Sequence, residues 1–73
     1  MSNLNTKLEI TVNGEPRAAK PGATVSDLLC ELGLESARVA IERNREILAR
    51  PQWQETRVQP GDNYEIVQFV GGG

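Results

Sequence analysis

The sequence has 73 residues and a formal net charge of −2, from eight Lys and Arg against ten Asp and Glu, and 38% of its residues are hydrophobic. A chain of this length suits one small domain, which buries only about 60% of the surface of the unfolded chain and leaves little room for a deep substrate pocket. Charges of both signs are scattered, with no basic run interleaved with aromatic residues, so binding to nucleic acid or to a membrane surface is not indicated.

The residue types argue against an enzyme. The sequence contains no histidine and a single cysteine, Cys30. Without histidine the chain lacks the commonest general base and metal ligand, and one cysteine can form neither an internal disulfide nor a cysteine-based metal site. We therefore predict no catalytic residue and no metal site. Five acidic residues are interpreted as solvated surface, some of them facing a basic partner: Glu42, Glu46, Glu55, Asp62 and Glu65.

The amino-terminal segment MSNLNTKLEI has neither the apolar stretch nor the cleavage site of a signal peptide. No apolar run approaches the roughly 20 residues that span a bilayer. A cytoplasmic protein is the expectation.

The first predicted element is a β-hairpin. Apolar and polar residues alternate along 7–12, KLEITV, as in a half-buried strand. Asn13 and Gly14 follow, and both residue types tolerate the positive φ angles of a tight hairpin turn. The return strand, EPRAA, is predicted to lie at an edge because Pro16 cannot donate a ladder hydrogen bond.

A helix is predicted next, from Thr24. Apolar residues recur at i, i+3, i+4 and i+7 between Val25 and Leu32, which forms one stripe of a helix. Thr24 suits the N-cap, and Asp27 gives a start that resembles a capping box. Gly33 fits the left-handed position that follows a helix end.

Three further strands are predicted at RVAIE, EILA and YEIVQFV. Asn44 and Arg45 form a turn between the first two, but Arg at a positive-φ position is unfavourable, so the turn type stays open. Trp53 is interpreted as an anchor that holds a loop on the core. Pro60 and Gly61 have the pattern of a type II turn before the last strand.

This order of elements predicts an α+β domain. A hairpin, a helix and several short strands can cover their apolar faces in a mixed sheet of four to five strands with one main helix across one face. The first and last strands are the most apolar and are expected to lie centrally. The arrangement is the ubiquitin-like β-grasp.

The sequence resembles the ThiS family, the sulfur carriers of thiamine biosynthesis. The resemblance runs from about Leu8 to Gly73, and its motifs stand in the family's order: Asn13-Gly14, TVSDLL, VAIERN, EILARPQW and PGDNYEIVQFVGGG. The chain departs from the family at Asn44-Arg45, where members commonly have Asn-Gly.

The resemblance implies a carrier rather than an enzyme. The C-terminal carboxylate of such carriers is adenylated by an ATP-dependent, ThiF-like activating enzyme, converted to a thiocarboxylate, and used as sulfur donor by a ThiG-like thiazole synthase. Gly73 then carries the reactive carboxylate, and Gly71 and Gly72 let a flexible tail, 71–73, thread from a domain at 1–70 into an active site. No cofactor is bound, since ATP and the sulfur donor are used through the partner enzyme.

The last strand also suggests a docking surface. If Tyr64 and Ile66 point into the core, alternation places Val67 and Phe69 on the opposite face, where exposed apolar residues often mark a partner site. Packing of Phe69 under a loop is the alternative.

Other functions stay open on the sequence alone. The glycine end also fits a sulfur carrier of another pathway, of the type of the small subunit of molybdopterin synthase. It fits as well a ubiquitin-like modifier attached to lysines through Gly73, or a plain binding module. Cys30 lies off the apolar stripe of the helix, and nothing beside it in the sequence activates its thiol.

Overall fold

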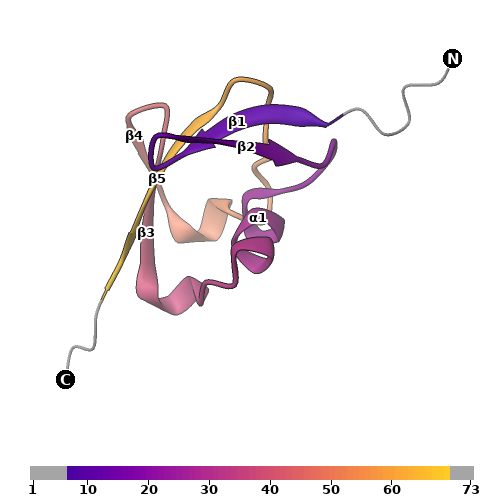
Figure 1. Cartoon of the computed structure of the whole chain (residues 1–73). Helices are drawn as coiled ribbons and strands as arrows, with labels where there is room; N and C mark the ends of the chain where they lie inside the picture. Colours follow the sequence, from indigo (N-terminus) through magenta and orange to yellow (C-terminus); the bar gives the residue numbers. More distant parts are fainter. Residues whose placement is uncertain (1–6, 70–73) are drawn as a thin grey trace, which may run out of the picture.

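The computed structural model describes residues 7–69, which contain five strands, one α-helix and two 3₁₀ turns (Figure 1). The strands are β1 (Leu8–Val12), β2 (Glu15–Ala19), β3 (Val39–Arg43), β4 (Glu46–Leu48) and β5 (Asn63–Gln68). The helices are α1 (Val25–Leu32), η1 (Ser36–Arg38) and η2 (Arg50–Gln52). Within residues 7–69, no helix is long and apolar enough to cross a membrane.

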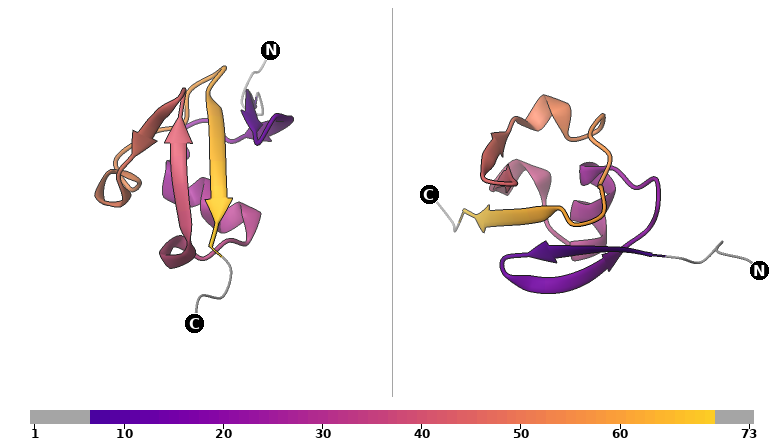
Figure 2. Two further views of the ribbon diagram at one scale, coloured as in Figure 1. Left: turned by 90° about the vertical axis from the view of Figure 1, so that its left-hand side faces the viewer. Right: turned by 90° about the horizontal axis from the view of Figure 1, so that it is seen from above.

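The five strands form one mixed sheet in the order β2-β1-β5-β3-β4. Only the β1–β5 pair is parallel, and the other pairs are antiparallel. The prediction of a central last strand is confirmed, and β2, which contains Pro16, lies at an edge as predicted. Helix α1 covers one face of the sheet, and the opposite face of β3, β4 and β5 is open (Figure 2).

Both hairpins close with two-residue turns. Asn13 and Gly14 have φ angles of 52° and 84°, as predicted for the first turn. The second turn has the same form, because Asn44 and Arg45 have φ angles of 53° and 72°. Arg45 thus adopts the positive φ that made its turn type uncertain from sequence.

The caps at both ends of α1 are those that the sequence predicts. The Thr24 hydroxyl accepts a hydrogen bond from the Asp27 backbone N–H at 3.2 Å, and the Asp27 carboxylate accepts one from the Thr24 N–H at 3.0 Å. This is a complete capping box. Gly33 has φ 73°, and the N–H of Leu34 donates to the Leu29 carbonyl at 3.1 Å, which closes the helix in a Schellman motif.

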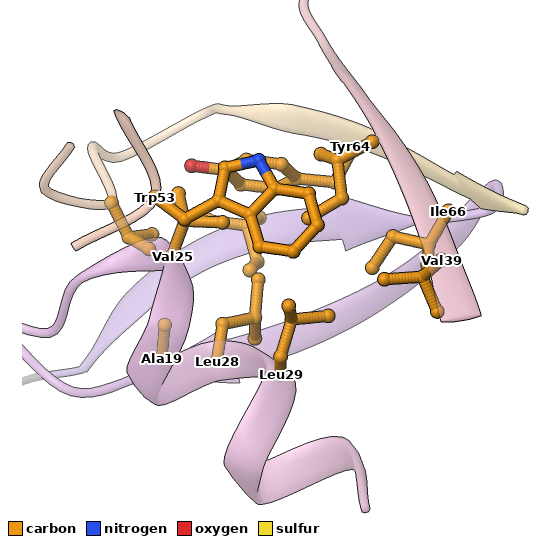
Figure 3. Packing of buried hydrophobic residues seen from close by; sticks show 11 residues of the cluster. Ala19, Val25, Leu28, Leu29, Val39, Trp53, Tyr64 and Ile66 are labelled. Atoms are coloured by element: carbon orange, nitrogen blue, oxygen red, sulfur yellow. The ribbon is translucent and has the colours of Figure 1, made fainter. Parts of the chain in front are cut away.

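The core lies between α1 and the sheet (Figure 3). Its buried apolar members are Ile10, Ala19, Val25, Leu28, Leu29, Val39, Ile41, Trp53, Val58, Tyr64 and Ile66. Trp53 anchors the segment after η2, as predicted: its ring is buried, and Nε1 donates to the Leu48 carbonyl at 2.9 Å. Arg50 stacks over the same ring, with its guanidinium carbon 5.2 Å from the ring centroid. The loop is thereby fixed to the core by an apolar, a polar and a cation–π contact.

Candidate functional site

Strand β5 is the element that leads the chain towards the glycines, and β3 holds it along its whole length. The antiparallel register runs from Arg43↔Tyr64 to Val39↔Gln68, and the Phe69 N–H continues it by donating to the Arg38 carbonyl at 2.7 Å. On its other side β5 pairs with β1 only at Asn63 and Tyr64. The second half of β5 therefore extends past the end of β1.

The side chain of Asn13 extends this short parallel ladder. Its Oδ1 accepts from the Ile66 N–H at 2.7 Å, and its Nδ2 donates to the Ile66 carbonyl at 3.2 Å. The Asn13 backbone N–H also donates to the Tyr64 carbonyl at 2.8 Å. One turn residue thus pairs with β5 as a further strand residue would. Sequence reasoning identified Asn13 only as a turn residue, because nothing local indicates its contact with Ile66.

Asn44 holds the start of the same strand from the other side. Its N–H donates to the Asn63 carbonyl at 2.8 Å, and its Oδ1 accepts from the Asn63 N–H at 2.9 Å. The Thr11 hydroxyl donates to Asn63 Oδ1 at 2.7 Å. The asparagines of the two hairpin turns therefore fix β5 from both flanks.

Asp62, immediately before β5, is buried, with 4% of its surface exposed. Its carboxylate accepts from the Gln59 N–H at 2.9 Å, the Tyr64 hydroxyl at 2.7 Å, Arg43 Nε at 3.0 Å and Asn44 Nδ2 at 3.2 Å. The interpretation of Asp62 as solvated surface is wrong. Its burial is stable because these four donors replace the water that the carboxylate loses.

These contacts set the protonation states of the network. Burial alone raises the pKa of Asp62, but the hydrogen bonds outweigh burial and hold that pKa below its usual value. Burial, followed by the hydrogen bond to Asp62, raises the pKa of Tyr64 far above its usual value. Burial lowers the pKa of Arg43, but the contact with Asp62 raises this pKa by more than burial lowers it, so the net shift is upward. At neutral pH the network is a fixed ion pair with a neutral tyrosine, which suits a structural role and not proton transfer.

The two predicted docking residues are exposed at the end of β5. Val67 is 59% exposed and Phe69 is 54% exposed, while Tyr64 and Ile66 are buried as the alternation predicted. The alternative in which Phe69 packs under a loop does not match this exposure. The predicted reactive residue and its tail, Gly71, Gly72 and Gly73, lie outside the described residues.

Sequence reasoning missed a third exposed apolar side chain, Ile47 in β4, which is 83% exposed. Its signal was present, because Leu48 turns towards the core and its neighbour must then face outward. Cys30 is a free, exposed cysteine in α1, and α1 covers the face of the sheet opposite to the one on which Ile47 lies. Among residues 7–69, no three His, Cys, Asp or Glu side chains gather as a metal site would require.

The five-stranded mixed sheet with one helix across one face defines a ubiquitin-like β-grasp domain. A family model described as the ThiS family matches residues 10–73, and the chain belongs to this family. A ThiS structure from Geobacter metallireducens superposes with a TM-score of 0.77 at 35% identity, over 90% of this chain and all of that one.

Two curated relatives add to the comparison. The sulfur carrier protein ThiS of Bacillus subtilis is 43% identical over 54 residues, which are 74% of this chain and 82% of that protein. A thiazole synthase of Paramagnetospirillum magneticum is 44% identical over 66 residues, or 90% of this chain. The chain spans only 20% of the length of that thiazole synthase.

Proposed function

We propose that this chain is a sulfur carrier of thiamine biosynthesis, which carries the sulfur of the thiazole moiety as a thiocarboxylate on Gly73. The observation that carries the proposal is the match of the ThiS family model through residues 10–73, which includes the glycines after β5. The protein is then a substrate passed between enzymes in the cytoplasm, and it performs no catalysis itself.

The chemistry requires activation of the carboxylate. A free α-carboxyl group has a pKa of about 3.5, so at neutral pH it is ionised and a poor electrophile. An oxygen of the Gly73 carboxylate attacks the α-phosphorus of ATP, and pyrophosphate leaves. A sulfur nucleophile then attacks the acyl carbon of the adenylate, and AMP leaves with one of the carboxylate oxygens.

The glycines suit this chemistry because it takes place inside another protein. Gly71 and Gly72 have no Cβ, so they can pass through a narrow channel and adopt φ angles that other residues avoid. The domain up to Phe69 is too large to follow them. Folded domain and tail therefore have separate roles, recognition and reaction.

Two partners follow from this proposal. A ThiF-like activating enzyme uses ATP and the sulfur donor, so the carrier needs no bound cofactor. A ThiG-like thiazole synthase takes the sulfur, and the similarity of the chain to part of a thiazole synthase supports this second partner. Val67 and Phe69, which are exposed and shortly precede the tail in the sequence, are the proposed contacts with the activating enzyme.

The test is an intact-mass measurement. The protein is incubated with ATP, a sulfur donor and the cognate activating enzyme, and its mass should rise by the difference between one sulfur and one oxygen atom. Thiazole formation after adding thiazole synthase then distinguishes this pathway from carriers of another pathway.

A variant with one residue added after Gly73 is the control, and it should not be converted. Lysine-linked adducts would instead indicate a protein modifier. An unchanged mass with a competent enzyme would contradict the sulfur-carrier proposal and leave a binding module.

A further inference from the structure

The face of β3, β4 and β5 that points away from α1 is not covered by another element of residues 7–69 (Figure 2). A hollow lined by residues of these three strands lies on this face, together with exposed apolar side chains. Ile47, Val67 and Phe69 are its exposed large apolar residues, at 83%, 59% and 54% exposure. Ile47 and Val67 line the hollow, and Ala40 lies directly opposite Val67 across the β3–β5 pair. Exposed apolar side chains grouped in this way are typical of a surface that another protein covers.

Two carboxylates lie in the same hollow. Glu42 and Glu65 both line it, and they are direct partners in the antiparallel β3–β5 register. Side chains in such positions are about 5 Å apart at Cβ, and like charges placed there destabilise the strand pair. The pair therefore lowers the stability of the isolated domain.

No ion pair offsets this repulsion within residues 7–69. The ion pairs in that part of the chain are Arg38–Glu35 and Arg43–Asp62, and neither involves Glu42 or Glu65. Arg45 also lines the hollow, but its guanidinium is not within ion-pair distance of either carboxylate. Two negative charges flanked by apolar side chains are electrostatically complementary to one positive charge set in an apolar surface.

We infer that this hollow receives an arginine or lysine side chain of the activating enzyme, inserted between Glu42 and Glu65. Apolar groups around that cation cover Ile47, Val67 and Phe69. The inference rests on the proposed function and specifies how the carrier is recognised. Glu65 and Val67 lie in β5 and Phe69 comes directly after it, so an enzyme bound here covers the end of the strand that precedes the glycines in the sequence.

The test compares stability with affinity. The double variant Glu42→Gln/Glu65→Gln should bind the activating enzyme about tenfold more weakly, with a smaller dependence on salt, because the cation loses its counter-charges. The same variant should have a higher Tm, since the cross-strand repulsion is gone. A merely structural role of the glutamates would not change affinity and stability in opposite directions.

Two further variants complete the titration series. Glu31→Gln, on α1, removes one negative charge away from this face, against two in the double variant, and should leave affinity unchanged. Phe69→Ala removes the exposed ring and should weaken binding while the fold stays intact. It therefore reports on the apolar docking contacts separately from the charges.

Three results would overturn the inference. If the double variant binds as tightly as wild type while Phe69→Ala binds more weakly, the enzyme docks here without inserting a cation. If Glu31→Gln lowers the binding free energy by half as much as the double variant, only overall charge matters. If the wild type sediments as a dimer and the double variant as a monomer, the occupant is a second copy of the chain. Failure of the proposed function is separate, since it appears as an unconverted mass for wild type with competent enzyme.

Discussion

Arg45 has a backbone conformation that is unfavourable for its residue type. It has φ 72° in a turn whose counterpart in the first hairpin is Gly14, at φ 84°. An L-residue in the left-handed region loses about 1–2 kcal/mol relative to the right-handed one, whereas glycine does not. A Cβ added at Gly14 meets no atom within 4 Å, so substitution there changes the backbone energy without a clash.

Exchanging these two residues separates backbone from side chain. Arg45→Gly should raise the free energy of unfolding by about 1 kcal/mol, and Gly14→Arg should lower it by about as much. Urea denaturation measures both changes. A loss of stability in Arg45→Gly would mean that the arginine side chain contributes more than its backbone conformation removes.

Asp62 shows what a local pattern cannot reveal about a residue. In Gln-Pro-Gly-Asp the sequence indicates a turn, and turn carboxylates are usually solvated. The side-chain donors that bury this one come from Arg43 and Asn44, 19 and 18 positions away. Only the folded sheet brings them together, so sequence reasoning placed Asp62 at the surface.

At the scale of the elements, β5 depends on two side chains outside the strand ladders. Asn13 bonds Ile66, and Asn44 bonds Asn63, each through its amide group. Both asparagines also have φ angles near 50°, at 52° and 53°, which the hairpin turns require. Each asparagine thus adopts the backbone conformation of its turn and also forms hydrogen bonds to β5.

Asn13→Gly tests this double role, because glycine keeps the turn and removes the amide. The Ile66 amide should exchange its hydrogen faster, and stability should fall by about 1–2 kcal/mol for two lost hydrogen bonds. Hydrogen exchange followed by NMR measures the effect. Asn44→Gly is the matched control and should accelerate exchange at Asn63 instead; equal acceleration at both amides in either variant would indicate general loosening of the sheet.

The elements themselves were largely predictable. Alternation in KLEITV, the stripe from Val25 to Leu32 and the caps at Thr24 and Gly33 are local signals, and the structure confirms each of them. The central place of β5 was also predicted, from its apolar character. The open face was predicted only in part, since the β3–β5 register that sets Glu42 against Glu65 depends on contacts distant in sequence.

For the whole molecule, the Asp62 network adds polar contacts between segments that also meet in the core. It links the turn at Gln59, the end of β3 at Arg43, the second hairpin turn at Asn44 and β5 at Tyr64. Because the folded state holds the pKa of Asp62 below its unfolded value, the unfolded chain binds the proton more tightly. The stabilisation is therefore complete above an unfolded pKa of about 3.9 and is lost as pH falls through the folded pKa.

Asp62→Asn should therefore destabilise the domain at neutral pH. It should also reduce the dependence of the free energy of unfolding on pH in the acid range. The expected loss is about 2 kcal/mol at pH 7, because the amide retains one acceptor but not the charge. The loss should shrink as pH falls below about 4, where wild type also loses the carboxylate. Denaturation at several pH values, followed by circular dichroism, measures both. Glu55→Gln, at an exposed site, should leave the dependence of stability on pH unchanged. If Asp62→Asn loses stability at acid pH as the wild type does, groups other than Asp62 cause that loss.

The central position of β5 also has a mechanical consequence. An enzyme that holds the chain beyond Phe69 and pulls along the axis of β5 loads a strand that β3 pairs from Tyr64 to Gln68 and that β1 pairs at Asn63 and Tyr64. The hydrogen bonds to β3 lie across that axis, so the load falls on many of them together in shear and cannot open them one by one. An edge strand such as β2 has a hydrogen-bonded neighbour on one side only. Under the proposed function, a partner enzyme can therefore release the protein without unfolding its sheet.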